Sequence, residues 1–158
     1  MLRHVSSIAC LALMACDTVP PTVISPDTAP VVTRAAVAQG GFGGLMNNAR
    51  AAAGLSPATP DPRLTAAAQA HADDMVRQGY YSHTGLDGSQ FTDRMRAAGY
   101  TSCNPGENIG GGQTSEAAAL ESWMGSSAHR ANILMPGTVQ YGLGQAGDKW
   151  VLLVARVC

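Results

Sequence analysis

Residues 139–158, VQYGLGQAGDKWVLLVARVC, are the part of the chain that best indicates its fold class. Two runs rich in strand-forming residues flank the tetrapeptide AGDK, a pattern that predicts an antiparallel β-hairpin. A third strand is expected within residues 100–112, where Gly106 and the glycines of 110–112 permit bends but weaken regular pairing. The sheet is therefore expected to come mainly from the last third of the sequence.

Helical periodicity dominates the sequence that precedes these strands. Asp61 and Pro62 form an N-cap and first-turn pair for the longest expected helix, which Gly79 ends. The expected helices cover residues 42–53, 62–78, 88–98, 116–126 and 129–135. Helices followed by an antiparallel sheet make an α+β arrangement.

The composition fits one domain and argues against nucleic acid as a partner. Apolar residues make up 46 % of the 158 residues but aromatic residues only 5 %, so the packing units are small. The formal net charge is −1, and Lys149 is the single lysine in a chain without any run of basic residues. A nucleic-acid-binding surface needs such a basic patch.

The first sixteen residues, MLRHVSSIACLALMAC, have the pattern of an export signal. Their apolar stretch has about a dozen residues, too few to span a bilayer, which takes roughly 20. The end of the segment, LMAC, resembles a bacterial lipobox, so we expect lipid attachment at Cys16. The alternative is an ordinary cleaved signal with an incidental cysteine.

These features divide the chain into three parts. Residues 1–15 are expected to be a lipoprotein-type signal peptide, and 16–40 a lipidated cysteine followed by a tether with four of the nine prolines. Residues 41–158 are expected to form the folded domain. The protein is then exported to the bacterial cell envelope and held at a membrane by its N-terminal lipid, on the periplasmic or extracellular face.

Export also determines which cysteines can pair. Cys10 leaves with the signal and Cys16 carries the lipid, so Cys103 and Cys158 remain in an oxidising compartment. A disulfide between them is predicted.

Three titratable residues lie at boundaries between expected elements: His83, Glu107 and His129. Two imidazoles and a carboxylate suit a divalent transition metal, Zn²⁺ above all. Nothing in their spacing forces them together, however, and three independent loop residues are the simpler interpretation.

Ordered motifs along residues 42–158 add a resemblance to this local evidence. The stretches that carry it are LMNNARAAAGLSP, L…AAQAHADDM…YYSH, DG…R…AGY, GENIGGG, SWMGSSAHRANILMP and YGLGQ. Together they resemble the bacterial extracytoplasmic branch of the CAP superfamily, the SCP-like proteins that include cysteine-rich secretory proteins, antigen 5 and pathogenesis-related 1. The resemblance implies an α-β-α sandwich with a small antiparallel sheet between helical layers, and a large cleft.

In that family two His and two Glu converge in the cleft and hold a divalent ion in some members. By the resemblance, His83, Glu107 and His129 match three of these positions. Ser126 stands at the fourth, three residues after Trp123, where the family has a second Glu. An incomplete tetrad of this kind implies a weak Zn²⁺ site at most, and no required cofactor.

Four other residues are interpreted more simply. His71 is expected to be a structural histidine at the edge of the core, and one of Tyr80 and Tyr81 to line the cleft. Arg130 either pairs with Glu107 or caps a helix end.

Three functions fit this sequence. The first is a non-enzymatic binding module for an apolar molecule or another cell-envelope ligand, because family members are implicated in binding sterols and lipids. The second is a hydrolase, peptidase-like, in which His83 or His129 acts as the base and Glu107 orients it. Neither a nucleophile-elbow pattern nor H-E-x-x-H occurs in the sequence. The third is a structural or protein-interaction domain with a vestigial cleft.

Overall fold

A computed structural model describes residues 41–156 and 158 of the chain. The predicted signal peptide, the lipidation site Cys16 and the proline-rich tether lie outside the described residues. In the part that is described, no helix combines the length and apolarity needed to cross a membrane.

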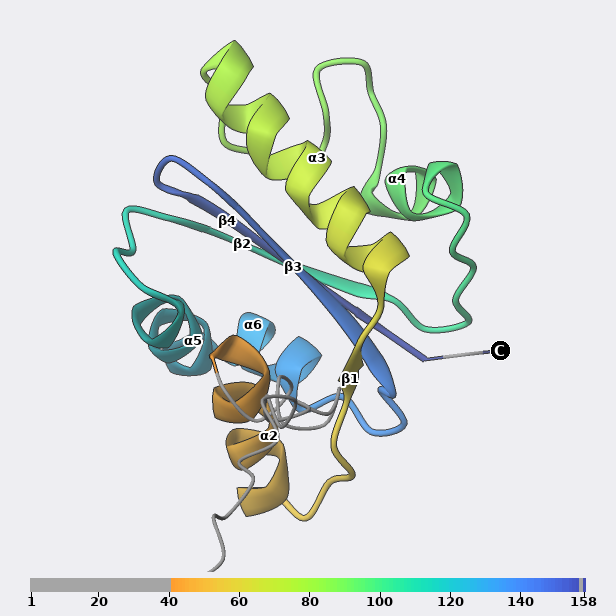
Figure 1. Ribbon diagram of the computed structural model, residues 1–158, viewed down its shortest axis with the longest axis vertical. Helices are drawn as coiled ribbons and strands as arrows, with labels where there is room; N and C mark the ends of the chain where they lie inside the picture. Colours follow the sequence, from red (N-terminus) through yellow and green to blue (C-terminus); the bar gives the residue numbers. More distant parts are fainter. Residues whose placement is uncertain (1–40, 157) are drawn as a thin grey trace, which may run out of the picture. The chain divides into compact units, whose positions relative to one another are not determined.

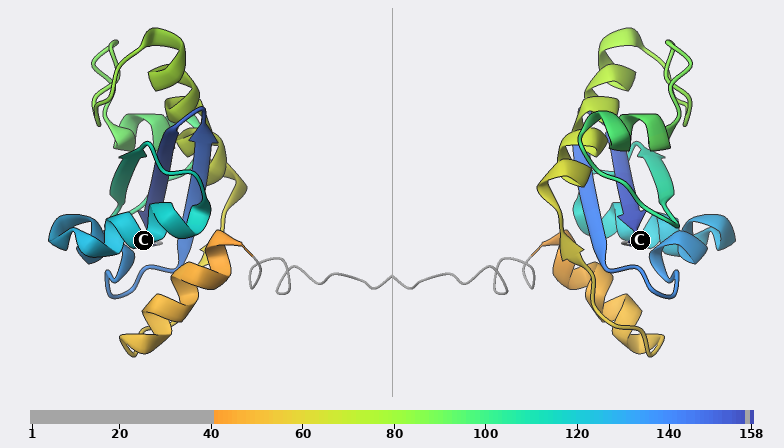
Figure 2. Two further views of the ribbon diagram at one scale, coloured as in Figure 1. Left: turned by 90° about the vertical axis from the view of Figure 1, so that its left-hand side faces the viewer. Right: turned by 90° about the vertical axis from the view of Figure 1, so that its right-hand side faces the viewer.

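The described residues form five helices and four strands, arranged as an α-β-α sandwich (Figure 1). The helices are α2 (Phe42–Ala52), α3 (Pro62–Gln78), α4 (Phe91–Ala97), α5 (Glu116–Gly125) and α6 (Ser127–Ile133). The strands are β1 (Thr59–Pro60), β2 (Gly106–Gly111), β3 (Gln140–Ala146) and β4 (Lys149–Ala155). Helices α3 and α4 cover one face of the sheet, and α2, α5 and α6 cover the other (Figures 1 and 2). The predicted fold class is confirmed.

The sheet has the strand order β1-β3-β4-β2. Strands β3 and β4 form the predicted antiparallel hairpin, and β2 pairs with β4 antiparallel along its whole length. The structure adds β1, which pairs parallel with β3 and which we did not predict. A two-residue strand that contains a proline is too short to leave a periodic pattern in the sequence.

Strand β4 is apolar from Trp150 to Ala155 because both of its faces are buried over these residues. Its side chains at 150, 152 and 154 join the core cluster beneath α2, α5 and α6. Those at 151, 153 and 155 join the cluster beneath α3 and α4. The two-residue period of a strand thus gives each helical layer its own core.

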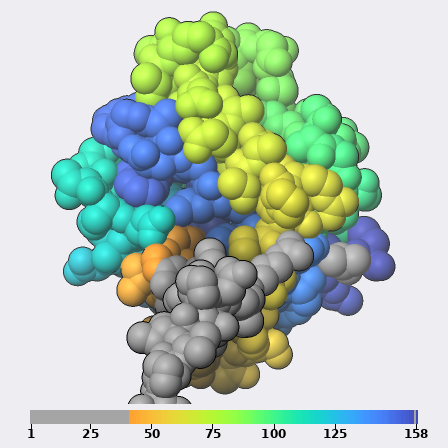
Figure 3. All heavy atoms as spheres, viewed as in Figure 1, coloured from red at the N-terminus to blue at the C-terminus, as the bar shows by residue number. Residues whose placement is uncertain are grey.

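Helix α3 packs closely on β3, and Figure 3 shows its yellow-green atoms against the blue atoms of the C-terminal part of the chain. A Cβ atom at Gly142 would overlap the backbone of Leu64 and Thr65, and one at Gly144 would overlap that of Ala68 and Gln69. The two glycines of YGLGQ therefore allow a close approach that no larger residue permits.

Two helices begin at positions other than those expected. Helix α4 starts at Phe91 instead of residue 88, because Gln90 and Asp93 form a capping box. Helix α6 starts at Ser127, two residues earlier than expected, immediately after α5 ends.

The predicted disulfide is present between Cys103 and Cys158, with Cα atoms 5.0 Å apart. It joins the loop before β2 to the residues after β4. Strands β2 and β4 are antiparallel neighbours. The bridge therefore links the start of the edge strand β2 to the end of β4.

Candidate functional site

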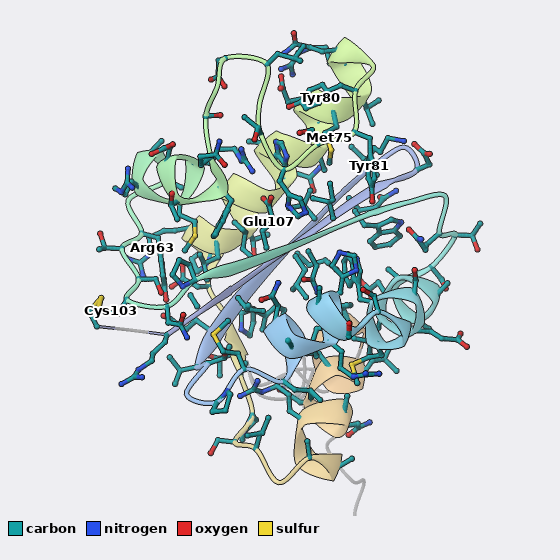
Figure 4. The ribbon with its side chains drawn as sticks, turned by 180° about the vertical axis from the view of Figure 1, so that it is seen from behind. Arg63, Met75, Tyr80, Tyr81, Cys103 and Glu107 are labelled. Carbon is teal, nitrogen blue, oxygen red and sulfur yellow. A yellow bond between two sulfur atoms is a disulfide. The ribbon has the colours of Figure 1, made fainter. Side chains whose placement is uncertain are left out.

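Glu107 is the centre of the candidate site and is almost completely enclosed. It lies on β2, its side chain is 1 % exposed, and its two carboxylate oxygens have different partners (Figure 4). Oε1 lies 2.7 Å from Nδ1 of His83, and Oε2 lies 2.7 Å from Nη2 of Arg94. Three elements far apart in the sequence therefore meet at one carboxylate.

The loop after α3 presents His83 to this carboxylate. Arg94 holds the loop through two further hydrogen bonds, from Nη2 to the carbonyl of His83 and from Nη1 to that of Ser89. Nε2 of the buried His71 lies 2.9 Å from the carbonyl of Ser82, so the structural role expected for His71 is confirmed. A carboxylate oxygen of Glu107 accepts the hydrogen bond from Nδ1 of His83. The other ring nitrogen, Nε2, is not used in this contact, and the side chain of His83 is 49 % exposed.

Arg94 was not among the predicted site residues, yet it has the strongest electrostatic role at the site. Its side chain is 12 % exposed, and its ion pair offsets the charge of the enclosed Glu107 carboxylate. The residue belongs to the stretch DG…R…AGY, one of those that carry the family resemblance. That motif was the only available sign, because the pairing depends on the tertiary arrangement that brings Arg94 of α4 to Glu107 of β2.

His129 approaches from the opposite helical layer, on α6. Its carbonyl accepts a hydrogen bond from Asn108, and Asn132 donates to both Asn108 and the carbonyl of Glu107, which ties α6 to β2. Burial lowers the pKa of His129, and the charge of His83 lowers it further.

Ser126 lies at the junction of α5 and α6, where it ends one helix and begins the other. Its side chain makes no capping hydrogen bond. Arg130 donates from Nη1 to the carbonyl of Met124, which places it at the C-terminal end of α5 and settles the choice left open above. It does not pair with Glu107, whose partner is Arg94.

These residues do not fit a divalent cation. No three His, Cys, Asp or Glu side chains of the described segment gather closely enough to hold a metal ion, and His83, Glu107 and His129 are not such a group. The physical reason is visible at Glu107, where both oxygens are engaged and Arg94 already supplies the positive charge. A second cation there would be repelled.

The two tyrosines before His83 have different environments. The hydroxyl of Tyr80 donates to Asp74 at 2.6 Å, and burial, together with this hydrogen bond, raises the pKa of Tyr80 to about 12. Tyr81 is 53 % exposed and lines two surface cavities. Tyr81 is therefore the accessible aromatic residue of this loop.

Known structures share this fold. The SCP-domain extracellular protein of Bacillus anthracis superposes with a TM-score of 0.69 at 27 % identity, over 71 % of this chain and 38 % of that one. An outer surface protein of Borrelia burgdorferi gives a TM-score of 0.66 at 17 % identity, over 73 % of this chain and 89 % of that one. A cysteine-rich secretory protein of Staphylococcus aureus gives 0.62 at 18 %, over 72 % and 36 %.

Sequence comparison gives the same assignment. The chain is 29 % identical over 100 residues to the uncharacterized membrane protein YlbC of Bacillus subtilis, a match that covers 63 % of this chain but only 29 % of YlbC. The model of the cysteine-rich secretory protein family matches residues 44–152. That match spans both helical layers and the strands between them, and the chain belongs to the CAP, or cysteine-rich secretory protein, family.

Proposed function

We propose that this chain is an exported binding module held at the bacterial cell envelope, and that it binds its ligand without hydrolysing it and without a metal. The observation that carries the proposal is the saturation of Glu107. One oxygen of its carboxylate accepts from His83 and the other from Arg94, within a side chain that is 1 % exposed. A carboxylate in this position serves to hold the loop that contains His83 and Tyr81.

A general base needs access to the proton that it removes. Glu107 lacks that access, because its side chain is enclosed and His83 and Arg94 occupy its two carboxylate oxygens. Ser126, at the position of the family's second glutamate, cannot act as a base at neutral pH. The carboxylate of Glu107 therefore has a structural role, which is to hold His83 and Arg94 in place.

One observation favours the alternative, a hydrolase. His83 is half-exposed and a carboxylate orients its Nδ1, an arrangement suited to a histidine base. The ion pair with Arg94 weighs against it, because Glu107 shares its carboxylate between His83 and a guanidinium whose positive charge offsets the carboxylate charge.

Three sequence and family features support placement at the envelope. They are the export signal, the LMAC sequence that ends at Cys16, and the extracellular or outer-surface description of two structural relatives. We expect Cys16→Ala to remove the acyl mass from the mature protein, which mass spectrometry of a membrane fraction measures. An unmodified N-terminus in the wild type would contradict lipid anchoring.

The function is tested with the full chain carrying Cys16→Ala, so that an acyl group cannot cause membrane association. The probes are phosphatidylethanolamine–phosphatidylglycerol vesicles and purified peptidoglycan sacculi. We expect co-sedimentation with one of them, unchanged by EDTA, and no cleavage product by mass spectrometry. Product release that His83→Ala abolishes would establish the hydrolase instead, and loss of binding in EDTA would refute metal independence.

A further inference from the structure

The exposed ring of Tyr81 lies near the tip of the β3–β4 hairpin, away from the Glu107 contacts (Figure 4). Two cavities, of about 390 Å³ and about 380 Å³, meet at this point. Both are lined by Tyr81, Asp148 and Lys149. Volumes of this size are in the range of small-molecule sites, about 300–1,000 Å³.

The charges at these cavities cancel. Nζ of Lys149 lies 3.0 and 2.9 Å from the two carboxylate oxygens of Asp148, and 5.5 Å from the centre of the Tyr81 ring. No other charged side chain of the described residues lines either cavity. The pair therefore offers hydrogen-bond donors and acceptors side by side without a net charge.

Glycines leave one wall of the second cavity without side chains. A Cβ atom at Gly111 would lie 3.6 Å from the Tyr81 ring and 3.7 Å from Nζ of Lys149, while one at Gly112 would meet nothing within 4 Å. A ligand can approach the backbone closely at such a position. The first cavity adds apolar and aromatic lining from α3 and the residues after it: Met75, Val76, Gly79 and Tyr80.

From this arrangement we propose that the groove formed by Tyr81, Lys149, Asp148, Gly111 and Gly112 binds an uncharged carbohydrate chain. A sugar ring has an apolar C–H face, which packs on an aromatic ring, and a rim of hydroxyls that both donate and accept hydrogen bonds. The groove offers a partner for both parts of the sugar. The Tyr81 ring can pack on the C–H face, and the Lys149–Asp148 pair can hydrogen-bond with the hydroxyls. The proposal rests on the binding function above and names its ligand class.

Other envelope ligands match the groove less well. An anionic lipid headgroup calls for an excess of positive charge, which Asp148 removes. A lipid tail calls for a wholly apolar enclosure, whereas an ion pair and glycine backbone line much of this groove.

The buried ion pair at Glu107 acts on this groove through the chain. Tyr81 is two residues from His83, whose carbonyl and ring are held by Arg94 and Glu107. These contacts therefore restrain the loop after α3, which contains both His83 and Tyr81.

The test is isothermal titration of the full chain carrying Cys16→Ala with tetra-N-acetylchitotetraose, a soluble uncharged amino-sugar chain. We expect measurable binding that Tyr81→Ala weakens roughly tenfold or more, as truncation of an aromatic anchor does. Tyr81→Phe keeps the ring and is expected to keep the affinity. Leu86→Ala, which removes a side chain that is 63 % exposed on the same loop, is the matched control and should change nothing.

A second variant addresses the groove independently of the aromatic ring. Gly111→Ala adds a methyl group at the groove wall, and we expect a loss of affinity with an unchanged melting temperature. Absence of sugar binding, or binding that Tyr81→Ala leaves unaltered, would overturn the carbohydrate proposal. Vesicle binding would then still uphold the binding function, whereas cleavage of the sugar would overturn both.

Discussion

Arg94 is expected to make the largest contribution of the site residues to the free energy of unfolding. Its guanidinium compensates the charge of the Glu107 carboxylate, which is nearly inaccessible to water. Removing one partner of a buried ion pair is far more destabilising than replacing both, because an uncompensated charge remains. The contacts of Arg94 with the carbonyls of His83 and Ser89 are lost at the same time. Arg94 therefore stabilises both the charge and the loop.

We expect Arg94→Met to lower the free energy of unfolding by about 3 kcal/mol. Urea denaturation followed by circular dichroism measures this change. Arg96→Met is the matched control: Arg96 lies on the same helix, is 62 % exposed and has its one ion pair among the described residues with Asp93, so its removal should cost under about 1 kcal/mol. Equal effects of the two variants would show that Glu107 does not depend on Arg94.

His71 gives the fold a defined response to pH. Burial lowers the pKa of His71 below its ordinary value, and the charge of Arg94 lowers it further, although Glu107 and Asp74 act in the opposite direction. The unfolded chain consequently binds a proton at a higher pH than the folded chain does. The contribution of neutral His71 to the free energy of unfolding is fully present above the pKa of the histidine in the unfolded chain, about 6.5. It is lost as the pH falls from that value toward the lower pKa of His71 in the folded chain.

This dependence is expected to weaken in His71→Gln, whose amide can donate to the same carbonyl of Ser82 but cannot take up a proton. Melting temperatures at pH 7.5 and 5.5 provide the measurement. The wild type should lose more between the two values than the variant does. His129, whose pKa is also lowered, contributes in the same direction in both proteins and cancels in the comparison. Parallel losses would assign the pH response to groups other than His71.

At the scale of elements, the contact between α3 and β3 depends on two glycines of the strand. Gly144→Ala would place a methyl group inside the backbone of α3 at Ala68 and Gln69. Because backbone cannot move aside as a flexible side chain does, we expect a loss of about 3 kcal/mol or more in the free energy of unfolding. Gly125→Ala is the control: its Cβ atom meets nothing within 4 Å, so stability should be unchanged or slightly raised. Native-like stability of Gly144→Ala would mean that the helix and strand are further apart than described.

The elements that local signals specify were predicted well, and those that depend on distant contacts were not. Helix α3 runs from Pro62 to Gln78 as expected, because its cap, its first-turn proline and its terminal glycine are all encoded nearby. Strand β1 forms by parallel pairing with β3, which lies far away in the sequence. A strand that depends on such a distant contact leaves no local pattern in the sequence. The start of α6 shifted because Ser126 serves two helices at once.

The site followed the same division. His83 and Glu107 were matched by the family resemblance, and the structure places them in direct contact. Arg94 was missed since its role depends on the burial of Glu107 and on the tertiary contact between the two side chains, neither of which a local spacing encodes. Tyr81 was one of two candidates: it is 53 % exposed, whereas Tyr80 packs against the core and donates a hydrogen bond to Asp74.

At the scale of the whole molecule, the disulfide between Cys103 and Cys158 joins residues 55 positions apart. A loop of this length corresponds to a chain-entropy contribution of about 4 kcal/mol, the mechanism of which is model-dependent. The same end of the sheet is held by hydrogen bonds from Cys103 and Ser102 to the carbonyl of Arg156. Together these contacts hold the edge strand β2, which carries Glu107, against β4.

We therefore expect the double variant Cys103→Ser, Cys158→Ser to be less stable by about 2–4 kcal/mol, and to lose order at β2 first. Hydrogen exchange measures both quantities: global unfolding from the slowest amides of β4, and local opening from the amides of Asn108 and Gly110, which face β4. The loosened strand should also release the loop that presents Tyr81, because Glu107 holds that loop through His83 and Arg94. If β2 and β4 instead lose protection equally, the bridge stabilises the domain as a whole and has no particular bearing on the site.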